Sequence, residues 1–360
     1  MITKIHLLHG IKPAGVENMC LNLTKIDSHN RNIAVYTNKD SNREMIKIYQ
    51  NFFDKVKLIS HKNTKAELIS LINNEKLINN EVVLISWFFP FNIKFISKLN
   101  VPMLSHIGTT AYAYGIIRKI KNQLIFLNLY FAKKNKVAFI YASEHIKKSY
   151  QEYYFYPKNI FEKVIHNGDL KITNDKNKIS YNSLNTLKFA MVGRLDKTKD
   201  FREYIHFSYK FNLKNSGHEY LIIGDGDDFD SLNILNSKLN SICTFLGTFH
   251  EIEKIYEKFD ILLFFNTNAE GFGNVIIESM NRCKLVVVRD CGGPAELIED
   301  GVTGLKFRNI EELNHKLFNL LNDPLKIKKI ILNAKQKFDK TFDISLIKNK
   351  YDLILEKLIS

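Results

Sequence analysis

The chain has 360 residues, of which 52 are Lys or Arg and 38 are Asp or Glu, so its formal net charge is +14. Apolar residues make up 45% and charged residues 25%, which is ordinary globular composition and excludes a disordered or fibrous chain. The length is about twice that of a typical single domain, so we expect two domains. The 4 cysteines are scattered, which excludes a disulfide scaffold and favours a reducing cytosol.

Short apolar runs alternate with helical stretches through the first half of the chain. The runs that we predict to be strands are Lys4–Leu8, Asn32–Tyr36, Val56–Leu58, Val82–Ser86, Met103–His106, Ala138–Ala142 and Lys163–Ile165. Amphipathic stretches between them, predicted to be helices, include Glu17–Lys25, Thr64–Asn73 and His145–Tyr153. Nearly unbroken apolar strands that alternate with helices indicate a parallel sheet covered on both faces.

The same alternation restarts in the second half of the chain. Its predicted strands are Leu187–Val192, Tyr220–Ile223, Cys243–Leu246, Ile261–Phe264, Leu285–Val288 and Gly304–Phe307, and a last helix is predicted at Ile344–Ile359. The polar stretch 169–186 has the composition of a linker. The predicted fold class is therefore α/β, with two Rossmann-like doubly wound domains facing across a cleft. We assign 1–168 to the first domain and 187–343 to the second.

The positive charge is unevenly distributed. Residues 1–170 hold 24 Lys or Arg and 12 Asp or Glu, whereas residues 171–360 hold 28 and 26. An excess of +12 on the first half would attract an anionic partner, such as nucleic acid, anionic lipid or an anionic substrate.

The loop and helix start after the predicted strand Ile261–Phe264 carry the densest signal. Gly271 and Gly273 allow a tight turn and a close approach to a ligand, and Asn274 is a good helix N-cap. The amides of such a helix start offer an anion site. Glu270 precedes the turn and Glu278 follows on the helix, and a carboxylate can accept from two vicinal sugar hydroxyls.

The spacing Glu270-x7-Glu278 resembles the signature of glycosyltransferase family 4, a retaining family with the GT-B fold. The segment Val192-Gly-Arg-Leu-Asp-Lys-Thr-Lys199 resembles the Gly-Arg-Leu element of that family, and Ala14-Gly-Val-Glu17 resembles its N-terminal glycine turn. The similarity extends over nearly the whole chain and is strongest from about residue 187 to 307. It implies a bacterial enzyme of surface-polysaccharide type, with the helix at 344–360 returning to the first domain.

The resemblance implies a set of roles for these residues. Arg194 and Lys199, which follow the first strand of the second domain, would stabilise a nucleotide diphosphate as it departs. Glu278 would hold the ribose, while Glu270 and the amides of Gly271–Gly273 would hold the sugar. The expected donor-binding residues are Gly15, Gly271, Phe272, Gly273, Asn274, Val275 and Glu278, and the expected catalytic residues are Glu270, Arg194, Lys199 and His106.

A metal or cofactor is not expected. The run Gly224-Asp-Gly-Asp-Asp228 fails as a calcium loop, because Phe229 supplies no oxygen ligand. It also fails as a dinucleotide loop, because its acids would repel a pyrophosphate. The expected partners are a nucleotide sugar, most simply a UDP-sugar, and a glycan or lipid-linked saccharide from lipopolysaccharide, capsule or related polysaccharide synthesis.

The location of the protein is expected to be cytoplasmic, because no apolar run is long enough to span a membrane and no signal peptide is recognisable. The segment 116–136 is both basic and apolar, so either a peripheral contact with the inner face of the membrane or a core helix with charged ends fits it. Two other functions stay open: a GT-B nucleotide-sugar epimerase, and a nucleic-acid-binding protein that charge alone suggests, although no reader motif is present and nucleic acid is not an expected partner.

Overall fold

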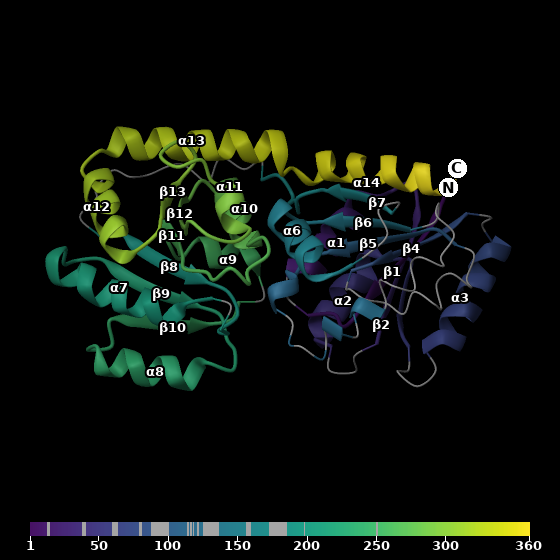
Figure 1. The fold of residues 1–360 in the computed structure, drawn as a ribbon, viewed down its shortest axis with the longest axis horizontal. Helices are drawn as coiled ribbons and strands as arrows, with labels where there is room; N and C mark the ends of the chain where they lie inside the picture. The colour runs from purple at the N-terminus through teal and green to yellow at the C-terminus, as the bar shows by residue number, and fades with distance from the viewer. Residues whose placement is uncertain are drawn as a thin grey trace. The chain divides into compact units, whose positions relative to one another are not determined.

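The computed structural model describes residues 1–12, 15–37, 41–59, 64–78, 81–87, 101–113, 115, 117, 119–120, 122–124, 137–155, 160–172, 186–197, 199–249 and 251–360. The chain divides into two compact units. The first unit comprises Met1–Leu170 together with Ile344–Ser360, and the second comprises Lys171–Asp343. Figure 1 labels most of the helices and strands of both.

The described residues of the first unit form a seven-stranded parallel sheet with the strand order β3-β2-β1-β4-β5-β6-β7. Its strands are β1 (Thr3–Leu8), β2 (Arg31–Tyr36), β3 (Lys55–Leu58), β4 (Val82–Ser86), β5 (Met103–Ile107), β6 (Val137–Tyr141) and β7 (Phe161–Val164). Its helices are α1 (Gly15–Lys25), α2 (Arg43–Phe52), α3 (Thr64–Ile78), the short 3-10 helix η1 (Ala111–Ala113), α6 (Glu144–Tyr153) and α14 (Ile344–Ile359).

Burial along the strands follows their position in this sheet. Every residue of β1, β4, β5 and β6 is buried. The two edge strands β3 and β7 are only partly covered. Strands inside a parallel sheet are covered on both faces, so they need uninterrupted apolar sequence, and this is the pattern from which they were predicted.

Helix α14 completes the core of the first unit although it lies far away in the sequence. It packs beside α1 and β6. The residues that it buries in this core are Ile344, Ile347, Tyr351, Ile354, Leu355 and Leu358. The helix begins where the amide of Ile344 donates to the carbonyl of Asp169, at 3.0 Å.

The second unit has a six-stranded parallel sheet in its described residues, with the strand order β10-β9-β8-β11-β12-β13. Its strands are β8 (Lys188–Val192), β9 (Glu219–Ile223), β10 (Cys243–Gly247), β11 (Ile261–Phe264), β12 (Leu285–Arg289) and β13 (Leu305–Phe307). Its helices are α7 (Phe201–Lys214), α8 (Phe229–Lys238), α9 (Ile252–Tyr256), α10 (Asn274–Asn281), α11 (Pro294–Leu297), α12 (Ile310–Leu321) and α13 (Pro324–Thr341).

The predicted fold class, two α/β units built on parallel sheets, is confirmed. Each predicted strand is present with ends that differ by at most two residues, and the last helix has the predicted bounds, Ile344–Ile359. Residues 173–185 of the expected linker lie outside the described residues.

Candidate functional site

The carboxyl end of β8 positions the first candidate residues of the second unit. The chain leaves β8 through Gly193 and Arg194 and returns as Lys199, which forms an antiparallel bridge with Asn266 after β11. The Lys199 side chain lies directly over Gly193, where a Cβ atom would be only 2.7 Å from the Lys199 Cε atom. The absence of a side chain at Gly193 therefore leaves the space that the Lys199 side chain occupies at the end of the sheet.

Lys199 and Glu270 are brought into direct contact. The Lys199 Nζ atom lies 2.8 Å from the Glu270 Oε2 atom, and the two side chains are only 15% and 16% exposed. Arg289 supports this arrangement, because its Nη1 atom donates to the carbonyl oxygen of Asn266 at 3.3 Å and lies 3.3 Å from Asp200 Oδ2. A charged pair held at the end of a sheet by backbone pairing is pre-organised for an ionic or polyhydroxyl ligand.

Helix α10 begins immediately after this pair. Gly271, Phe272 and Gly273 are buried, and Gly273 is the N-cap residue with φ of +85°, a left-handed conformation that favours glycine. The prediction that Asn274 is the N-cap is wrong: Asn274 is the first helical residue, and no side chain caps the helix. The anion-binding potential therefore comes from the backbone at the start of α10, such as the Val275 amide, and from the positive end of the helix dipole.

Glu278 lies one turn into α10 and is held from α9. The Tyr256 hydroxyl donates to the Glu278 carboxylate. Arg282 lies over the Tyr256 ring, 4.5 Å from its centroid, and its Nη1 atom donates to the Glu278 carbonyl at 3.1 Å. This role of Tyr256 could not be predicted, because nothing in its local sequence distinguishes it from the other aromatic residues.

Arg194 is arranged differently from Lys199. Its Nε atom lies 2.6 Å from Asp196 Oδ2, and its side chain is 77% exposed. The long, exposed guanidinium side chain has freedom to move towards a ligand, but the structure gives it no fixed direction towards Glu270.

His106 is fully buried at the end of β5 in the first unit. Its Nδ1 atom lies 2.6 Å from the hydroxyl of Tyr351 on α14. Burial lowers the pKa of His106 to about 3, so the imidazole is neutral at pH 7 and can act as a hydrogen-bonding group but not as a cation. The start of α1 lies close by: Gly15 is its first residue, and a Cβ atom at Gly108 would lie 3.1 Å from Val16 Cγ2 and 3.6 Å from His106 Nε2.

The candidate residues thus form two groups. Lys199, Glu270 and the start of α10 belong to the second unit, whereas His106 and Gly15 belong to the first. Most of the basic segment 116–136 lies outside the described residues. Of its described part, Ile117, Ile120 and Leu124 are 73%, 58% and 57% exposed.

A cavity of about 20 Å³ lies in the first unit among Lys4, His6, Asp27, Asn32 and helix α14. A space of this size holds about one water molecule, so it cannot accommodate a sugar or a nucleotide. Among the described residues, no group of three or more His, Cys, Asp or Glu side chains could hold a metal ion. None of the described helices combines the length and the apolar sequence needed to cross a membrane.

Residues 173–337 match the family model of glycosyl transferases group 1. This stretch is therefore similar in sequence to the glycosyl transferases group 1 family. The match covers most of the second unit, including Lys199, Glu270 and Glu278, so the charged pair and the start of α10 lie inside the matched stretch.

Two curated proteins of similar sequence are named as glycosyltransferases. Alpha-1,3/1,6-mannosyltransferase ALG2 of Dictyostelium discoideum is 26% identical over 207 residues, which cover 50% of this chain and 49% of that protein. A glycosyltransferase of Methanocaldococcus jannaschii with no characterised function is 28% identical over 255 residues, which cover 68% of this chain and 66% of that protein. The chain therefore spans about half to two thirds of the length of these curated relatives.

The fold also resembles solved structures. The Anabaena protein Alr3699/HepE, in complex with UDP and glucose, superposes with a TM-score of 0.80 at 17% sequence identity, covering 99% of this chain and 100% of that chain. This similarity shows the fold, two Rossmann-like units in succession as in GT-B proteins.

Proposed function

We propose that this protein is a retaining glycosyltransferase of family 4 that transfers a sugar from a nucleotide-diphosphate sugar. The observation that carries the proposal is the Lys199–Glu270 pair, with a separation of 2.8 Å, at the start of α10 within the stretch that matches the glycosyl transferases group 1 family. It puts a group that binds phosphate and a group that binds hydroxyls at one point, which is what an activated sugar requires. A UDP-sugar is the donor we propose, because Alr3699/HepE of similar fold is described with UDP and glucose.

Each candidate residue then has a role. Glu278, oriented by the Tyr256 hydroxyl, binds the ribose hydroxyls. Glu270 and the backbone at Gly271–Gly273 bind the hydroxyls of the transferred sugar, and the Phe272 side chain in this turn is buried. Lys199, with Arg194 and the first-turn amides at Asn274 and Val275, stabilises the negative charge that develops on the leaving diphosphate. No metal or cofactor takes part in the mechanism that we propose.

The transfer that we propose occurs on one face of the sugar. The bond between the anomeric carbon and the diphosphate oxygen breaks, and a bond from the acceptor hydroxyl forms on the same side. The acceptor proton passes to the leaving phosphate oxygen, so protons and charge balance. Neutral His106, with Gly15 at the start of α1, contributes hydrogen bonds from the first unit.

The acceptor that we propose is a glycan or lipid-linked saccharide in bacterial lipopolysaccharide, capsule or related polysaccharide synthesis. The excess charge of +12 in residues 1–170 supports an acceptor presented at an anionic surface. The exposed apolar side chains at Ile117, Ile120 and Leu124 support a peripheral contact with the inner face of the cell membrane.

The test of this proposal compares Lys199→Ala with Lys197→Ala, in which an exposed neighbouring lysine is removed. After a panel of nucleotide sugars has been screened by thermal stabilisation, turnover is measured with the donor that stabilises most. We expect Lys199→Ala to lower turnover about 100-fold, the size of effect seen when one group that stabilises developing charge is removed, and Lys197→Ala to leave it unchanged.

If folded Lys199→Ala protein had the same turnover as the wild type, the role of the lysine would be contradicted. Conversion of the donor sugar without an acceptor would instead indicate an epimerase. The anomeric configuration of the product, measured by NMR, tests retention separately.

A further inference from the structure

Four aromatic side chains of the first unit pack together, with Trp87 in contact with the other three. They are His6 on β1, Trp87 after β4, His106 on β5 and Tyr351 on α14. The Trp87 ring lies 6.1 Å from His6, 5.0 Å from His106 and 6.3 Å from Tyr351, measured between ring centroids. All four are buried, so their hydrogen bonds determine where each proton resides.

The proton on His6 can be located from its neighbours. The Trp87 indole can only donate, and its Nε1 atom lies 3.1 Å from His6 Nδ1, which must therefore accept. Burial raises the pKa of the Cys20 thiol, 3.4 Å from the same nitrogen, so this group also remains a donor. His6 consequently carries its proton on Nε2 and donates it to Asn32 Oδ1 at 3.0 Å. These bonds fix Trp87, against which His106 packs.

The number of unsatisfied hydrogen-bonding groups indicates which ring nitrogen of His106 carries the proton. If the Tyr351 hydroxyl donates to Nδ1, one group, Nε2–H, is left without a partner among the described residues. If Nδ1–H donates to the hydroxyl instead, both the hydroxyl proton and the Nε2 lone pair lack a partner there. Each unsatisfied buried polar group is costly, so the first arrangement is favoured. Burial also raises the pKa of Tyr351, which keeps the hydroxyl protonated.

We infer that Tyr351 is a positioning residue, whose hydroxyl holds His106 as the tautomer that presents Nε2–H to an oxygen of the bound donor or acceptor. The nitrogen faces the loop after β5, where Gly108 has no side chain: a Cβ atom there would lie 3.6 Å from Nε2. The start of α1 borders the same space through Val16. The inference rests on the proposed function for the identity of the ligand, a sugar or phosphate oxygen, but the tautomer does not depend on it.

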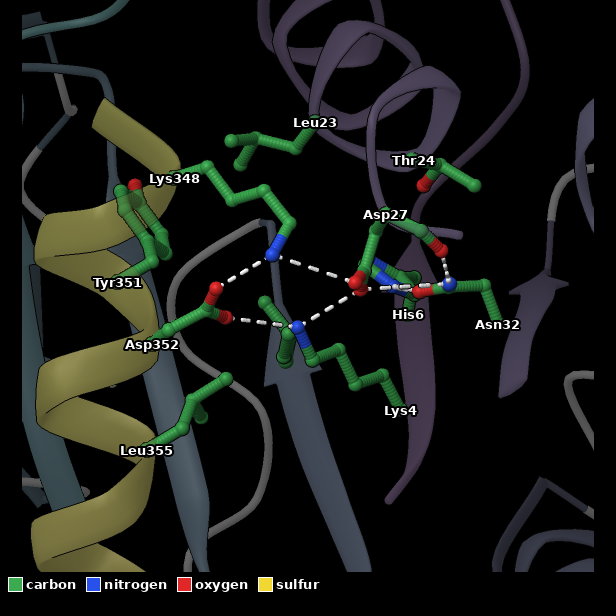
Figure 2. Close-up of a pocket in the computed structure, with 11 residues that line it drawn as sticks. Lys4, His6, Leu23, Thr24, Asp27, Asn32, Lys348, Tyr351, Asp352 and Leu355 are labelled. Atoms are coloured by element: carbon green, nitrogen blue, oxygen red, sulfur yellow. Dashed lines mark hydrogen bonds and ion pairs between the residues drawn. The ribbon is translucent and has the colours of Figure 1, made fainter. Parts of the chain in front are cut away.

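Helix α14 is also held in place by a partly buried ionic network, which Figure 2 shows. Lys4 Nζ lies 2.7 Å from Asp27 Oδ2 and 2.9 Å from Asp352 Oδ1. Lys348 Nζ lies 3.3 Å from Asp27 Oδ1 and 2.5 Å from Asp352 Oδ2. Two residues that flank Tyr351 on α14 are thereby tied to β1 and to the end of α1. This network resists sliding of the helix, which would withdraw the Tyr351 hydroxyl from His106.

The tautomer is tested first in the unmodified protein. Long-range ¹H–¹⁵N NMR spectra distinguish a protonated Nε2 from a protonated Nδ1, and the His106 signals are assigned by their loss in His106→Gln. We expect protonation on Nε2. Protonation on Nδ1 would overturn the inference without any variant of Tyr351.

The second arm compares Tyr351→Phe with Tyr204→Phe. Tyr204 is also fully buried and donates to backbone carbonyls within the second unit, at 3.1 and 3.2 Å, so its variant controls for the loss of a buried hydroxyl. We expect Tyr351→Phe to change the His106 spectrum and to lower turnover about fivefold, as for one neutral hydrogen bond, while the affinity for UDP alone stays the same. Tyr204→Phe should alter neither the His106 spectrum nor turnover.

Other outcomes separate the two hypotheses. A wild-type spectrum and wild-type turnover in Tyr351→Phe would overturn the positioning role. A loss of UDP affinity and turnover together would indicate a general structural role and would also overturn it. If the wild-type protein bound no nucleotide and transferred no sugar, the proposed function would fail. The part of the inference that concerns the ligand would fail with it. The NMR measurement would still decide which tautomer His106 adopts.

Discussion

Replacement of His6 by Gln should make the first unit less sensitive to acid. Burial, reinforced by the Lys4 charge against the opposing effects of Asn32 and Asp27, lowers the pKa of His6 from 6.5 to about 4. Between these two pH values the unfolded chain binds a proton that the folded chain does not, so stability falls as the pH falls. At about 1.4 kcal/mol per pH unit, the loss between pH 6.5 and 4 is roughly 3 kcal/mol, a large part of the stability of an ordinary domain.

His106 contributes in the same direction, because burial lowers its pKa from 6.5 to about 3. With both histidines present, the free energy of unfolding should change by up to about 2.7 kcal/mol per pH unit in the middle of this range. In His6→Gln the slope should fall to about 1.4 kcal/mol per pH unit. Gln is a suitable replacement, because it can both accept from Trp87 and donate to Asn32.

The assay is urea unfolding at several pH values between 4.5 and 7, followed by tryptophan fluorescence. The chain has 1 tryptophan, and Trp87 lies in the first unit beside His6, so the signal reports on the relevant unit. The variant His29→Gln, which replaces an exposed histidine, controls for the substitution. If His6→Gln kept the full wild-type slope, the reasoning about the buried imidazole would be refuted.

Three further predictions concern other parts of the molecule. Tyr256→Phe should weaken UDP binding about fivefold by isothermal calorimetry, because it removes the hydrogen bond that orients Glu278; unchanged affinity would contradict that role. Gly293→Ala should destabilise the second unit by roughly 3 kcal/mol or more in thermal unfolding, because the new Cβ atom would lie 1.7 Å from the backbone oxygen of Gly271; a wild-type melting temperature would show that the loop can move aside. Asp27→Asn should lower the free energy of unfolding by about 2 kcal/mol at pH 7, since it removes one of the two carboxylates that Lys4 and Lys348 share and leaves Asp352 as the other. Burial alone would raise the pKa of Asp27, but the Lys4 charge and the hydrogen bonds of the carboxylate outweigh it and lower the pKa. The difference in unfolding free energy between wild type and Asp27→Asn should therefore shrink as the pH falls below about 4. A difference that stays constant with pH would refute this.

The strands could be predicted from the sequence because buried parallel strands are mostly apolar runs of four to six residues, as in β4 and β11, although β1 also buries Lys4 and His6. The N-cap of α10 could not be predicted as readily. Asn274 has the better intrinsic preference, but the tight turn before α10 requires a left-handed residue, and Gly273 satisfies it with φ of +85°. The N-cap therefore lies one residue earlier than the sequence predicts, because the turn before α10 determines which residue can occupy it.

The candidate site was only partly predictable. The spacing from Glu270 to Glu278 and the position of Lys199 after β8 identify charged residues at strand ends, but their contact depends on the bridge between Lys199 and Asn266, which is distant in sequence. Tyr351 lies within the predicted last helix, Ile344–Ile359. Its hydroxyl was the available signal, since a buried tyrosine needs a hydrogen-bond partner, yet sequence gives no means of identifying His106 as that partner.

The discontinuity of the first unit has a consequence for synthesis on the ribosome. The second unit, Lys171–Asp343, is one continuous stretch and can fold as soon as it emerges. The first unit must wait for residues 344–360, and until they arrive the surface that later receives Ile347, Tyr351 and Leu355 faces water. A nascent chain of this protein therefore exposes an apolar strip for the time needed to translate the whole second unit, a natural point of engagement for a ribosome-associated chaperone.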